Sequence, residues 1–249
     1  MLSLNNLTVG YDRHPVIHHL NMTVEPGQMI ALIGPNGGGK STLLKTIIDQ
    51  VKPMDGSITN SFRKIGYISQ LYSTNRDFPV SVGFFVSSAL FRQVGLFGRI
   101  SKDAVRNALK TVHLEGFQNK YLSTLSGGQF QRVQFARLYL QQPELLLLDE
   151  PFSAVDQKTT AELIELLKEW NSRGKTVIAV MHDLNLVKDH FPYTVALARE
   201  IVASGKTSDI LTEETILKTF SLDMAVNPNA GVCQRNGEHE HCEQEKTEN

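Results

Sequence analysis

Residues 34–42, GPNGGGKST, combine closely spaced glycines with a lysine and two hydroxyl side chains. The spacing Gly34-x-x-x-x-Gly39-Lys40-Ser41 matches the P-loop pattern of phosphate-binding loops in full. Glycines allow backbone N–H groups to surround a phosphate, and the N-terminus of the helix that follows adds partial positive charge. We expect Lys40 to reach the β- and γ-phosphates of a nucleotide and the Ser41 hydroxyl to bind Mg²⁺. The alternative is a glycine-rich turn that carries an incidental lysine.

Two adjacent acids follow a continuous apolar run in the segment LLLLDEP, residues 145–151. A carboxylate at the end of a buried strand, here Asp149, is suited to hold Mg²⁺ through water beside a P-loop. Glu150 comes next and is suited to orient or deprotonate an attacking water. The alternative is an apolar strand that ends in two solvated acids, but the complete P-loop upstream favours a nucleotide site.

Three single residues stand at the ends of predicted strands, where ligand groups collect in parallel sheets. Gln70 ends KIGYISQ and is able to bind Mg²⁺ or the attacking water, although a surface glutamine would look the same. His182 ends TVIAVMH and is able to contact a γ-phosphate, although an isolated histidine is more often structural. Tyr11 ends the first strand and is able to stack on adenine, although an edge-strand tyrosine more often only packs.

Composition excludes several classes of protein. The 249 residues are 41% hydrophobic and 20% charged, as in ordinary globular proteins. A net charge of −1 gives no general electrostatic case for binding nucleic acid. We find no apolar run long enough to span a bilayer and no signal-peptide pattern, and the cysteines, Cys233 and Cys242, both lie near the C-terminus and form no disulfide framework. The cytosol is the expected compartment.

The elements that must position the site residues follow from the hydrophobic pattern. Alternation over residues 2–11 and 16–28 predicts an antiparallel strand pair, while the runs 29–34 and 145–150 are typical of strands buried on both faces. Further strands are expected at residues 57–59, 64–69, 175–182 and 193–200. Helices are expected at residues 40–51, 81–94, 101–114, 127–142 and 159–170, and from residue 183 on.

This order predicts a mostly parallel α/β core that a helical insert interrupts at about residues 78–142. We expect one ordered domain over residues 1–222. Residues 223–249 are polar and acidic, and we expect them to form a poorly ordered tail.

A second glycine-rich turn, LSGGQ at residues 125–129, opens a predicted helix but carries no lysine. The sequence also contains, in this order, GPNGGGKST, YISQ, LLLLDEP, SAVD (residues 153–156) and MHD (residues 181–183). LSGGQ stands between YISQ and LLLLDEP. Through these motifs the chain, from residue 2 to about 220, resembles the nucleotide-binding domain of the ABC (ATP-binding cassette) ATPases. The resemblance implies a P-loop NTPase of the ABC type, with an antiparallel β subdomain and a helical subdomain.

The resemblance also implies roles for site residues. Glu150 would be the catalytic base, His182 the γ-phosphate switch, Tyr11 the adenine-stacking aromatic and Gln70 the glutamine that links Mg²⁺ to the transporter-facing loop. SAVD would be a dimer-contact loop. The residues expected to hold ATP and Mg²⁺ are Tyr11, Gly34, Pro35, Asn36, Gly37, Gly38, Gly39, Lys40, Ser41, Thr42, Gln70, Asp149, Ser126, Gly127, Gly128 and Gln129. The departures from the family pattern are small: Val155 replaces a common leucine, and Phe130 replaces a polar residue without a consequence that we can assign.

In this family LSGGQ completes a site on another copy of the chain. Ser126, Gly127 and Gly128 would present a hydroxyl and backbone N–H groups to an anion at a helix N-terminus. Two chains would meet head to tail, and each γ-phosphate would lie between one chain's P-loop and the other's LSGGQ. Because one chain has one copy of each motif, a homodimer with two composite ATP sites is implied.

The resemblance implies a transporter motor bound peripherally at the cytoplasmic face of the inner membrane, with separate integral membrane permease subunits, an extracytoplasmic solute-binding protein and no nucleic acid. The apolar stretch 71–91 lies where the family docks a cytoplasmic helix of the permease, although an ordinary helical core explains most of it. The competing class is a soluble ABC ATPase acting on ribosomes or in DNA repair. Such proteins typically carry two cassettes or a long coiled coil, and this sequence shows neither.

The segments DFPVSV (residues 77–82), GLFGRIS (residues 95–101) and MHDLNLV (residues 181–187) look most like the ATPases of zinc and manganese importers. Iron chelates or another small solute stay open as substrates. The tail segment CQRNGEHEHC holds four side chains of types that bind Zn²⁺, although their spacing matches no standard zinc-finger pattern and a tail with incidental ligand types is the alternative. These tail residues are Cys233, His239, His241 and Cys242.

Overall fold

The structure is a computed structural model, and it describes residues 1–12, 14–69, 79–91, 95, 100–153 and 155–221. The strands are β1 (Leu2–Tyr11), β2 (His14–Val24), β3 (Met29–Ile33), β4 (Asp55–Asn60), β5 (Ile65–Ile68), β6 (Leu145–Asp149), β7 (Thr176–Val180), β8 (Tyr193–Ala198) and β9 (Glu200–Lys206). The α-helices are α1 (Lys40–Ile47), α2 (Val82–Ser87), α4 (Lys102–Thr111), α5 (Gly127–Gln141), α6 (Gln157–Ser172), α7 (Leu184–His190), α8 (Thr207–Ile210) and α9 (Glu213–Ser221). Short 3₁₀ turns are η2 (Ser88–Leu90), η3 (Phe117–Asn119) and η4 (Leu122–Thr124).

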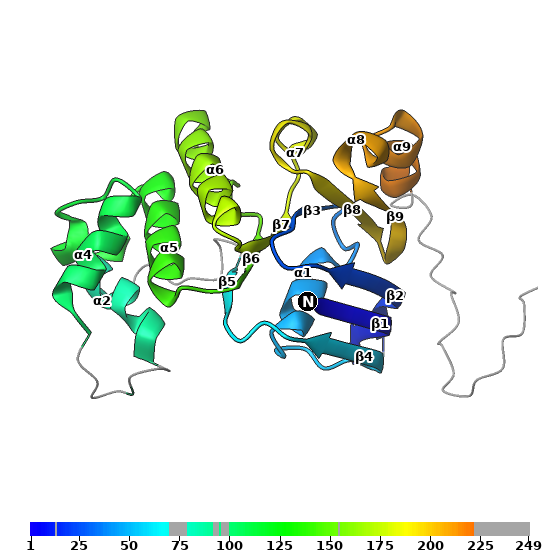
Figure 1. Ribbon diagram of the computed structural model, residues 1–249, viewed down its shortest axis with the longest axis horizontal. Coiled ribbons are helices and arrows are strands. Elements are labelled where there is room, and N and C mark those ends of the chain that lie inside the picture. The colour runs from blue at the N-terminus through cyan, green and yellow to red at the C-terminus, as the bar shows by residue number, and fades with distance from the viewer. Residues whose placement is uncertain (13, 70–78, 92–94, 96–99, 154, 222–249) are drawn as a thin grey trace, which may run out of the picture.

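A six-stranded sheet with the order β5-β6-β7-β3-β8-β9 forms the centre of the molecule (Figure 1). Its first five strands are parallel, and β9 pairs antiparallel with β8. Every residue of β3, β6 and β7 is buried, which explains their continuous apolar runs, because both faces of these strands are covered. The predicted buried strands are therefore confirmed. The sequence pattern did not predict β9, whose residues are mostly half-exposed.

The predicted antiparallel pair is also confirmed, since β1 pairs with β2 along most of its length. The opposite edge of β1 pairs with β4 and completes a three-stranded sheet with the order β2-β1-β4. Helix α1 lies between this sheet and the central one (Figure 1), and apolar side chains from all three form one core cluster.

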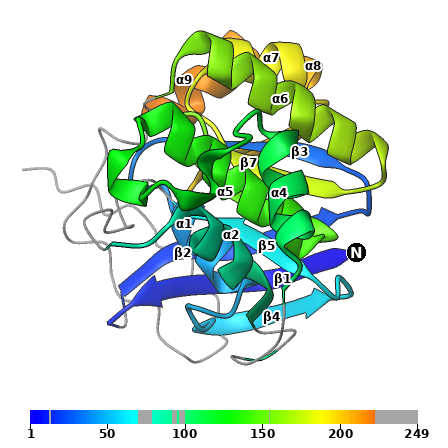
Figure 2. The same cartoon turned by 90° about the vertical axis from the view of Figure 1, so that its left-hand side faces the viewer.

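Helices α2, α4 and α5 form a separate group beside β5 and β6 (Figures 1 and 2). They pack on one another through aromatic contacts such as Phe85 with Phe130, whose ring centroids lie 6.0 Å apart. Phe135 of α5 packs on Trp170 of α6, with their ring centroids 6.1 Å apart. The helix-rich stretch expected from the sequence is present, and it holds LSGGQ at the start of α5.

The first helix is shorter than expected. The hydrophobic pattern predicted a helix to residue 51, but α1 ends at Ile47. Asp49 adopts a left-handed φ of 64°, and the N–H groups of Gln50 and Val51 both turn back to the Lys45 carbonyl oxygen. The helix end is therefore closed by backbone hydrogen bonds in a tight turn, which hydrophobic periodicity does not detect.

Candidate nucleotide-binding site

Several of the predicted site residues lie at the ends of three neighbouring strands, at one edge of the central sheet. The P-loop follows β3, His182 follows β7, and Asp149 ends β6, and these strands are adjacent in the order β6-β7-β3. Because the three strands are parallel, their carboxyl ends meet at the same edge of the sheet. Residues that are far apart in the sequence therefore face one another across a short distance.

The P-loop turns sharply at positions that only glycine fits. Gly39 caps α1 with φ 96°, and a Cβ atom there would lie 2.5 Å from Cγ1 of Ile17. A Cβ atom at Gly34 would lie 1.9 Å from the carbonyl oxygen of Leu197 on β8. The loop backbone therefore lies closely against β2 and β8, and any side chain at these positions would displace it.

Lys40 is buried, and its ammonium group lies against the loop itself. Nζ donates to the carbonyl oxygens of Gly34 at 2.8 Å and Pro35 at 2.7 Å. An ammonium group in this position is a strong charge-assisted hydrogen-bond donor for an anion that enters the loop.

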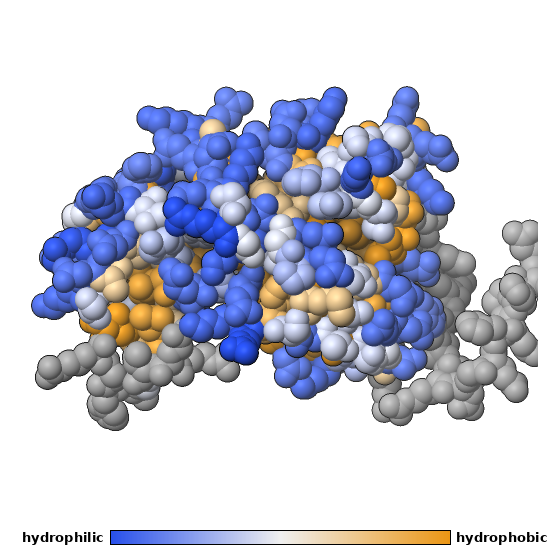
Figure 3. Space-filling model, viewed as in Figure 1, coloured by the Kyte–Doolittle hydropathy of each residue, from blue (hydrophilic) through white to orange (hydrophobic). Residues whose placement is uncertain are grey.

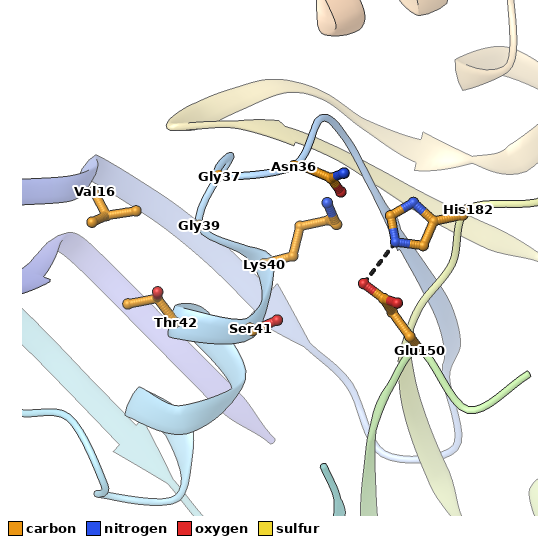
Figure 4. Close-up of a pocket in the computed structure, with 9 residues that line it drawn as sticks. All are labelled: Val16, Asn36, Gly37, Gly39, Lys40, Ser41, Thr42, Glu150 and His182. Carbon is orange, nitrogen blue, oxygen red and sulfur yellow. Dashed lines mark ion pairs between the residues drawn. The ribbon is translucent and has the colours of Figure 1, made fainter. Parts of the chain in front are cut away.

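A cavity of about 540 Å³ opens above the loop (Figure 4). Its wall combines the P-loop with the two residues that follow β6 and β7. The lining residues are Val16, Asn36, Gly37, Gly39, Lys40, Ser41, Thr42, Glu150 and His182. In Figure 4 the side chains of Lys40, Glu150 and His182 point toward the same space. The volume lies in the range of sites for cofactors and small molecules.

Asp149 receives hydrogen bonds on both carboxylate oxygens. The Ser41 hydroxyl donates to Oδ1 at 2.9 Å, and the Tyr67 hydroxyl donates to Oδ2 at 3.4 Å. Burial raises the pKa of Asp149, and the bonds from Ser41 and Tyr67 oppose that rise. Burial and the nearby Asp149 in turn raise the pKa of Tyr67, so its phenol keeps its proton near neutral pH.

The donor set around Asp149 fits Mg²⁺. The Ser41 hydroxyl at the start of α1 and the Asp149 carboxylate at the end of β6 lie 2.9 Å apart. Both are hard oxygen ligands of the kind that this ion accepts together with phosphate and water. A buried carboxylate whose charged form is disfavoured by desolvation also gains from a nearby cation.

Glu150 and His182 form an ion pair across the mouth of the cavity. Oε1 of Glu150 lies 2.7 Å from Nε2 of His182. Glu150 has a left-handed φ of 50°, a conformation that is uncommon for a residue with a Cβ atom. Uncommon backbone conformations of this kind gather at functional sites, where the surrounding fold holds them.

The LSGGQ turn forms the N-terminus of α5. The Ser126 side chain accepts from the N–H of Gln129, and the Gln129 side chain accepts from the N–H of Ser126, which makes a reciprocal capping box. Gly127 and Gly128 occupy the first turn, whose N–H groups have no acceptor within the helix. The residues that line the cavity do not include this turn, so the described part of the chain does not bring LSGGQ to its own P-loop.

The SAVD segment is tied to the LSGGQ helix within the same chain. Asp156 caps α6 by accepting from the N–H and the hydroxyl of Thr159, and these bonds hold its pKa below the ordinary value. Arg132 of α5 donates to the Thr159 hydroxyl at 3.2 Å and pairs with Glu162 at 2.5 Å. A Cβ atom at Gly128 would lie 3.4 Å from Oδ2 of Asp156. The two motifs therefore form one connected unit.

Some predicted residues lie elsewhere. Tyr11 ends β1 and is 46% exposed, but it is not among the cavity residues. Gln70 and the four tail candidates, Cys233, His239, His241 and Cys242, lie outside the described residues. Within the residues that are described, no group of three or more His, Cys, Asp or Glu side chains is placed to hold a metal ion.

Sequence reasoning missed three residues that help to build the site. Val16 of β2 lines the cavity, Tyr67 supports Asp149, and Arg132 joins α5 to α6. Val16 and Arg132 belong to none of the motifs used for the prediction, and Tyr67 opens the motif YISQ but was given no role there. The roles of all three depend on contacts between distant segments. The tyrosine hydroxyl in the otherwise apolar strand segment IGYI was the available signal for Tyr67.

No helix in the described ranges is long and apolar enough to cross a bilayer.

Comparisons with known proteins agree with this geometry. The family model described as ABC transporter matches residues 17–153. The manganese transport system ATP-binding protein MntB of Halalkalibacterium halodurans is 36% identical over 234 residues, which cover 90% of this chain and 94% of that protein. The zinc transport system ATP-binding protein TroB of Treponema pallidum is 33% identical over 229 residues, with 88% and 86% covered. A solved dimer of the ATP-binding cassette MJ0796 in a post-hydrolysis state, bound to ADP and phosphate, is 29% identical with a TM-score of 0.72 and covers 83% of this chain and 99% of that one.

Proposed function

The chain belongs to the ABC transporter family, and on this premise we propose that it is the ATP-hydrolysing subunit of an importer for a divalent metal, manganese or zinc. As a member of the family it is an ATP-binding subunit of a transport system and an ATPase. The substrate rests on its likeness to ATP-binding proteins of manganese and zinc transport systems. An importer of iron chelates or of another small solute is the alternative, and a soluble ABC ATPase without a transport role fits less well.

The single observation that supports hydrolysis best is the grouping of Lys40, Glu150 and His182 around one cavity at the carboxyl edge of the sheet. Lys40 binds the β- and γ-phosphates, and the backbone N–H groups of the P-loop surround them. Glu150 accepts a proton from the attacking water, and His182 orients Glu150 and then contacts the γ-phosphate. Bound Mg²⁺ supplies charge neutralisation at the phosphate oxygens, and Ser41 and Asp149 are the residues that would hold it.

The active form is a homodimer in this proposal. Each P-loop is completed by the LSGGQ turn of the other copy, because the chain's own turn is held in α5 away from the cavity. The N–H groups of Gly127 and Gly128 at the start of α5 suit a γ-phosphate. The link from Gly128 through Asp156 and Thr159 to Arg132 keeps the turn and the SAVD segment in one unit that meets the partner together. The dimeric cassette MJ0796 supports the arrangement by analogy.

The membrane partner docks on the helical group. Figure 3 shows an apolar area over α2, where Phe84 is 55% exposed and Tyr121 lies near its N-cap with 53% exposure. A solvent-exposed apolar surface of this kind is typical of a protein interface. We assign it to an integral membrane permease, with an extracytoplasmic solute-binding protein on the far side of the membrane. The chain would then lie peripherally at the cytoplasmic face.

Uptake measurements test the proposed substrate. A deletion strain is complemented with the wild-type chain, with Glu150→Gln or with an empty vector, and cellular manganese, zinc and iron are measured by mass spectrometry under metal limitation. We expect the wild type, and not Glu150→Gln, to restore manganese or zinc. Restoration of iron alone would favour the iron-chelate alternative, and unchanged levels of all three metals would reject a metal substrate. Isolation of the membrane chain that copurifies with the wild type identifies the permease.

A further inference from the structure

Tyr67 lies beside the proposed metal ligand, and although it opens the segment YISQ, none of the expected site roles falls on it. It is the third residue of β5, the edge strand that pairs with β6, and it is registered with Leu147, two residues before Asp149. Its hydroxyl lies 3.4 Å from Oδ2 of Asp149. Ser41 donates to the other oxygen, Oδ1, at 2.9 Å. The carboxylate is thus held from two sides, by a strand and by a helix.

The two hydrogen bonds determine how the carboxylate is oriented. Asp149 is 3% exposed, so water has little access to replace a missing donor. A carboxylate with one donor is free to rotate about its χ2 torsion, whereas donors on both oxygens fix the plane. Each oxygen has two lone-pair directions, so Oδ2 is able to accept from Tyr67 and from a metal-bound water together.

We propose that Tyr67 is a positioning residue for the metal ion of the ATP site, which it serves by fixing the carboxylate of Asp149. The inference rests on the proposed function, because that function supplies the metal. Partners that orient metal-binding carboxylates typically change metal affinity by about 10- to 100-fold when they are removed. Since the bond from Tyr67 is long, we expect an effect at the lower end of this range.

The strand that carries Tyr67 also leads along the chain toward the helical group. β5 ends at Ile68, and α2 is the next helix that the structure describes along the chain. The strand that supports the metal ligand is therefore the one that leads toward the helical group, where the LSGGQ turn also lies (Figure 1). A shift of β5 along β6 would alter the hydrogen bond to Asp149 and, through it, the affinity for the metal.

The chain offers a matched control. Tyr193 of β8 is half-buried and packs against the same core cluster as Tyr67. It begins β8, so it lies at the amino edge of the sheet, whereas Asp149 lies at the carboxyl edge and three strands away. Replacement of either tyrosine by phenylalanine removes one hydroxyl and retains the ring.

The experiment measures metal binding directly. Mn²⁺ replaces Mg²⁺, and its free concentration is followed by electron paramagnetic resonance in the presence of a non-hydrolysable ATP analogue, for the wild type, Tyr67→Phe and Tyr193→Phe. We expect the dissociation constant of Mn²⁺ to rise about 10-fold in Tyr67→Phe and to stay within about twofold in Tyr193→Phe. The affinity for the analogue in EDTA should be unchanged in both variants.

Three results would overturn the inference. These are a Mn²⁺ affinity of Tyr67→Phe equal to that of the wild type, an equal loss in Tyr193→Phe, and a parallel loss of analogue binding in EDTA, which would indicate a general disturbance of the fold. A wild type that binds the analogue but no Mn²⁺ would overturn the proposed metal site itself, and a wild type that binds neither would overturn the proposed ATP site. Failure of the proposed function is thus visible in the wild type, and failure of the inference in the variant.

Discussion

The carboxylate of Glu150 lies 2.7 Å from Nε2 of His182, and the two residues follow neighbouring strands of one parallel sheet. The side chain of Glu150 is 17% exposed and that of His182 is 44% exposed, so the pair lies at the boundary between the cavity and solvent. The candidate base is therefore already oriented by a partner that is able to reach an incoming phosphate.

If the two residues act as a unit, their replacements will not be additive. We expect Glu150→Gln and His182→Ala each to lower kcat by at least about 100-fold, with nucleotide binding retained, because each removes part of one proton-accepting pair. The double variant should be little worse than the more damaged single variant. Single-turnover hydrolysis of the three variants provides the measurement, and a double variant whose loss equals the product of the single losses would show that the residues act independently.

Lys40 should control nucleotide affinity. Its Nζ is held by two loop carbonyl oxygens, and no other lysine or arginine is among the described residues that line the cavity. Lys40→Ala removes a charge-assisted contact of about 1.5–3 kcal/mol, which corresponds to a loss of roughly 10- to 100-fold in affinity for ATP. Isothermal titration calorimetry measures this affinity for ATP. Lys52→Ala, which removes an exposed lysine paired with Asp49, is the control and should bind ATP as the wild type does.

Much of the fold was predictable because it depends on short apolar runs. The β3 and β6 segments are buried throughout, and their composition reveals this without any knowledge of their neighbours. The predicted fold class and family are confirmed by the match to the ABC transporter model and by the likeness to solved cassettes. The end of α1 and the strand β9 were not predicted, because a backbone turn and a half-exposed edge strand leave a weak hydrophobic pattern.

The site was predictable to the extent that it lies in contiguous motifs. The P-loop and the Asp149–Glu150 pair are short segments, and their residue types alone indicate phosphate and metal binding. The hydrogen bond from Tyr67 to Asp149 joins residues 82 positions apart in the sequence, and the contact from Arg132 to Thr159 joins residues 27 apart. Such contacts depend on strand order and helix packing, which one sequence does not specify.

Asp149 should destabilise the chain when no metal is present. Burial raises its pKa, so the fold favours the protonated carboxyl, and the stability that this form provides is lost as the pH rises through the raised pKa. Asp149→Asn keeps an acceptor for Ser41 and removes the charge. We expect a higher Tm for the variant at about pH 8 in EDTA, and a difference that shrinks as the pH falls and the wild-type carboxyl takes up its proton.

Calorimetry over this pH range checks the effect, and ATP hydrolysis should be lost in the same variant. A wild type that is the more stable protein at the higher pH would contradict the assignment. Addition of Mg²⁺ with ATP should raise the Tm of the wild type more than that of Asp149→Asn, because a ligand that binds only the folded state stabilises it.

Gly128→Ala should separate stability from activity. A Cβ atom there would lie 3.4 Å from Oδ2 of Asp156, which is ordinary contact, and alanine favours a helix over glycine by about 1 kcal/mol. We therefore expect an unchanged or higher Tm but a strong loss of hydrolysis, since the added methyl group faces the joint between LSGGQ and SAVD. Gly83→Ala in α2 is the contrast, because its Cβ would lie 2.9 Å from the Gln118 carbonyl oxygen and should lower the Tm. Full activity in Gly128→Ala would show that this joint does not matter for hydrolysis.

In the proposed homodimer one chain supplies the P-loop and another the LSGGQ turn of each ATP site. Multi-angle light scattering of Glu150→Gln with and without ATP and Mg²⁺ measures whether this dimer forms, because blocked hydrolysis leaves the γ-phosphate in place between the two motifs. We predict a monomer without ATP, a dimer with ATP, and a monomer again when Ser126→Phe is added to Glu150→Gln to obstruct the turn. A Glu150→Gln chain that binds ATP yet stays a monomer would contradict the composite site.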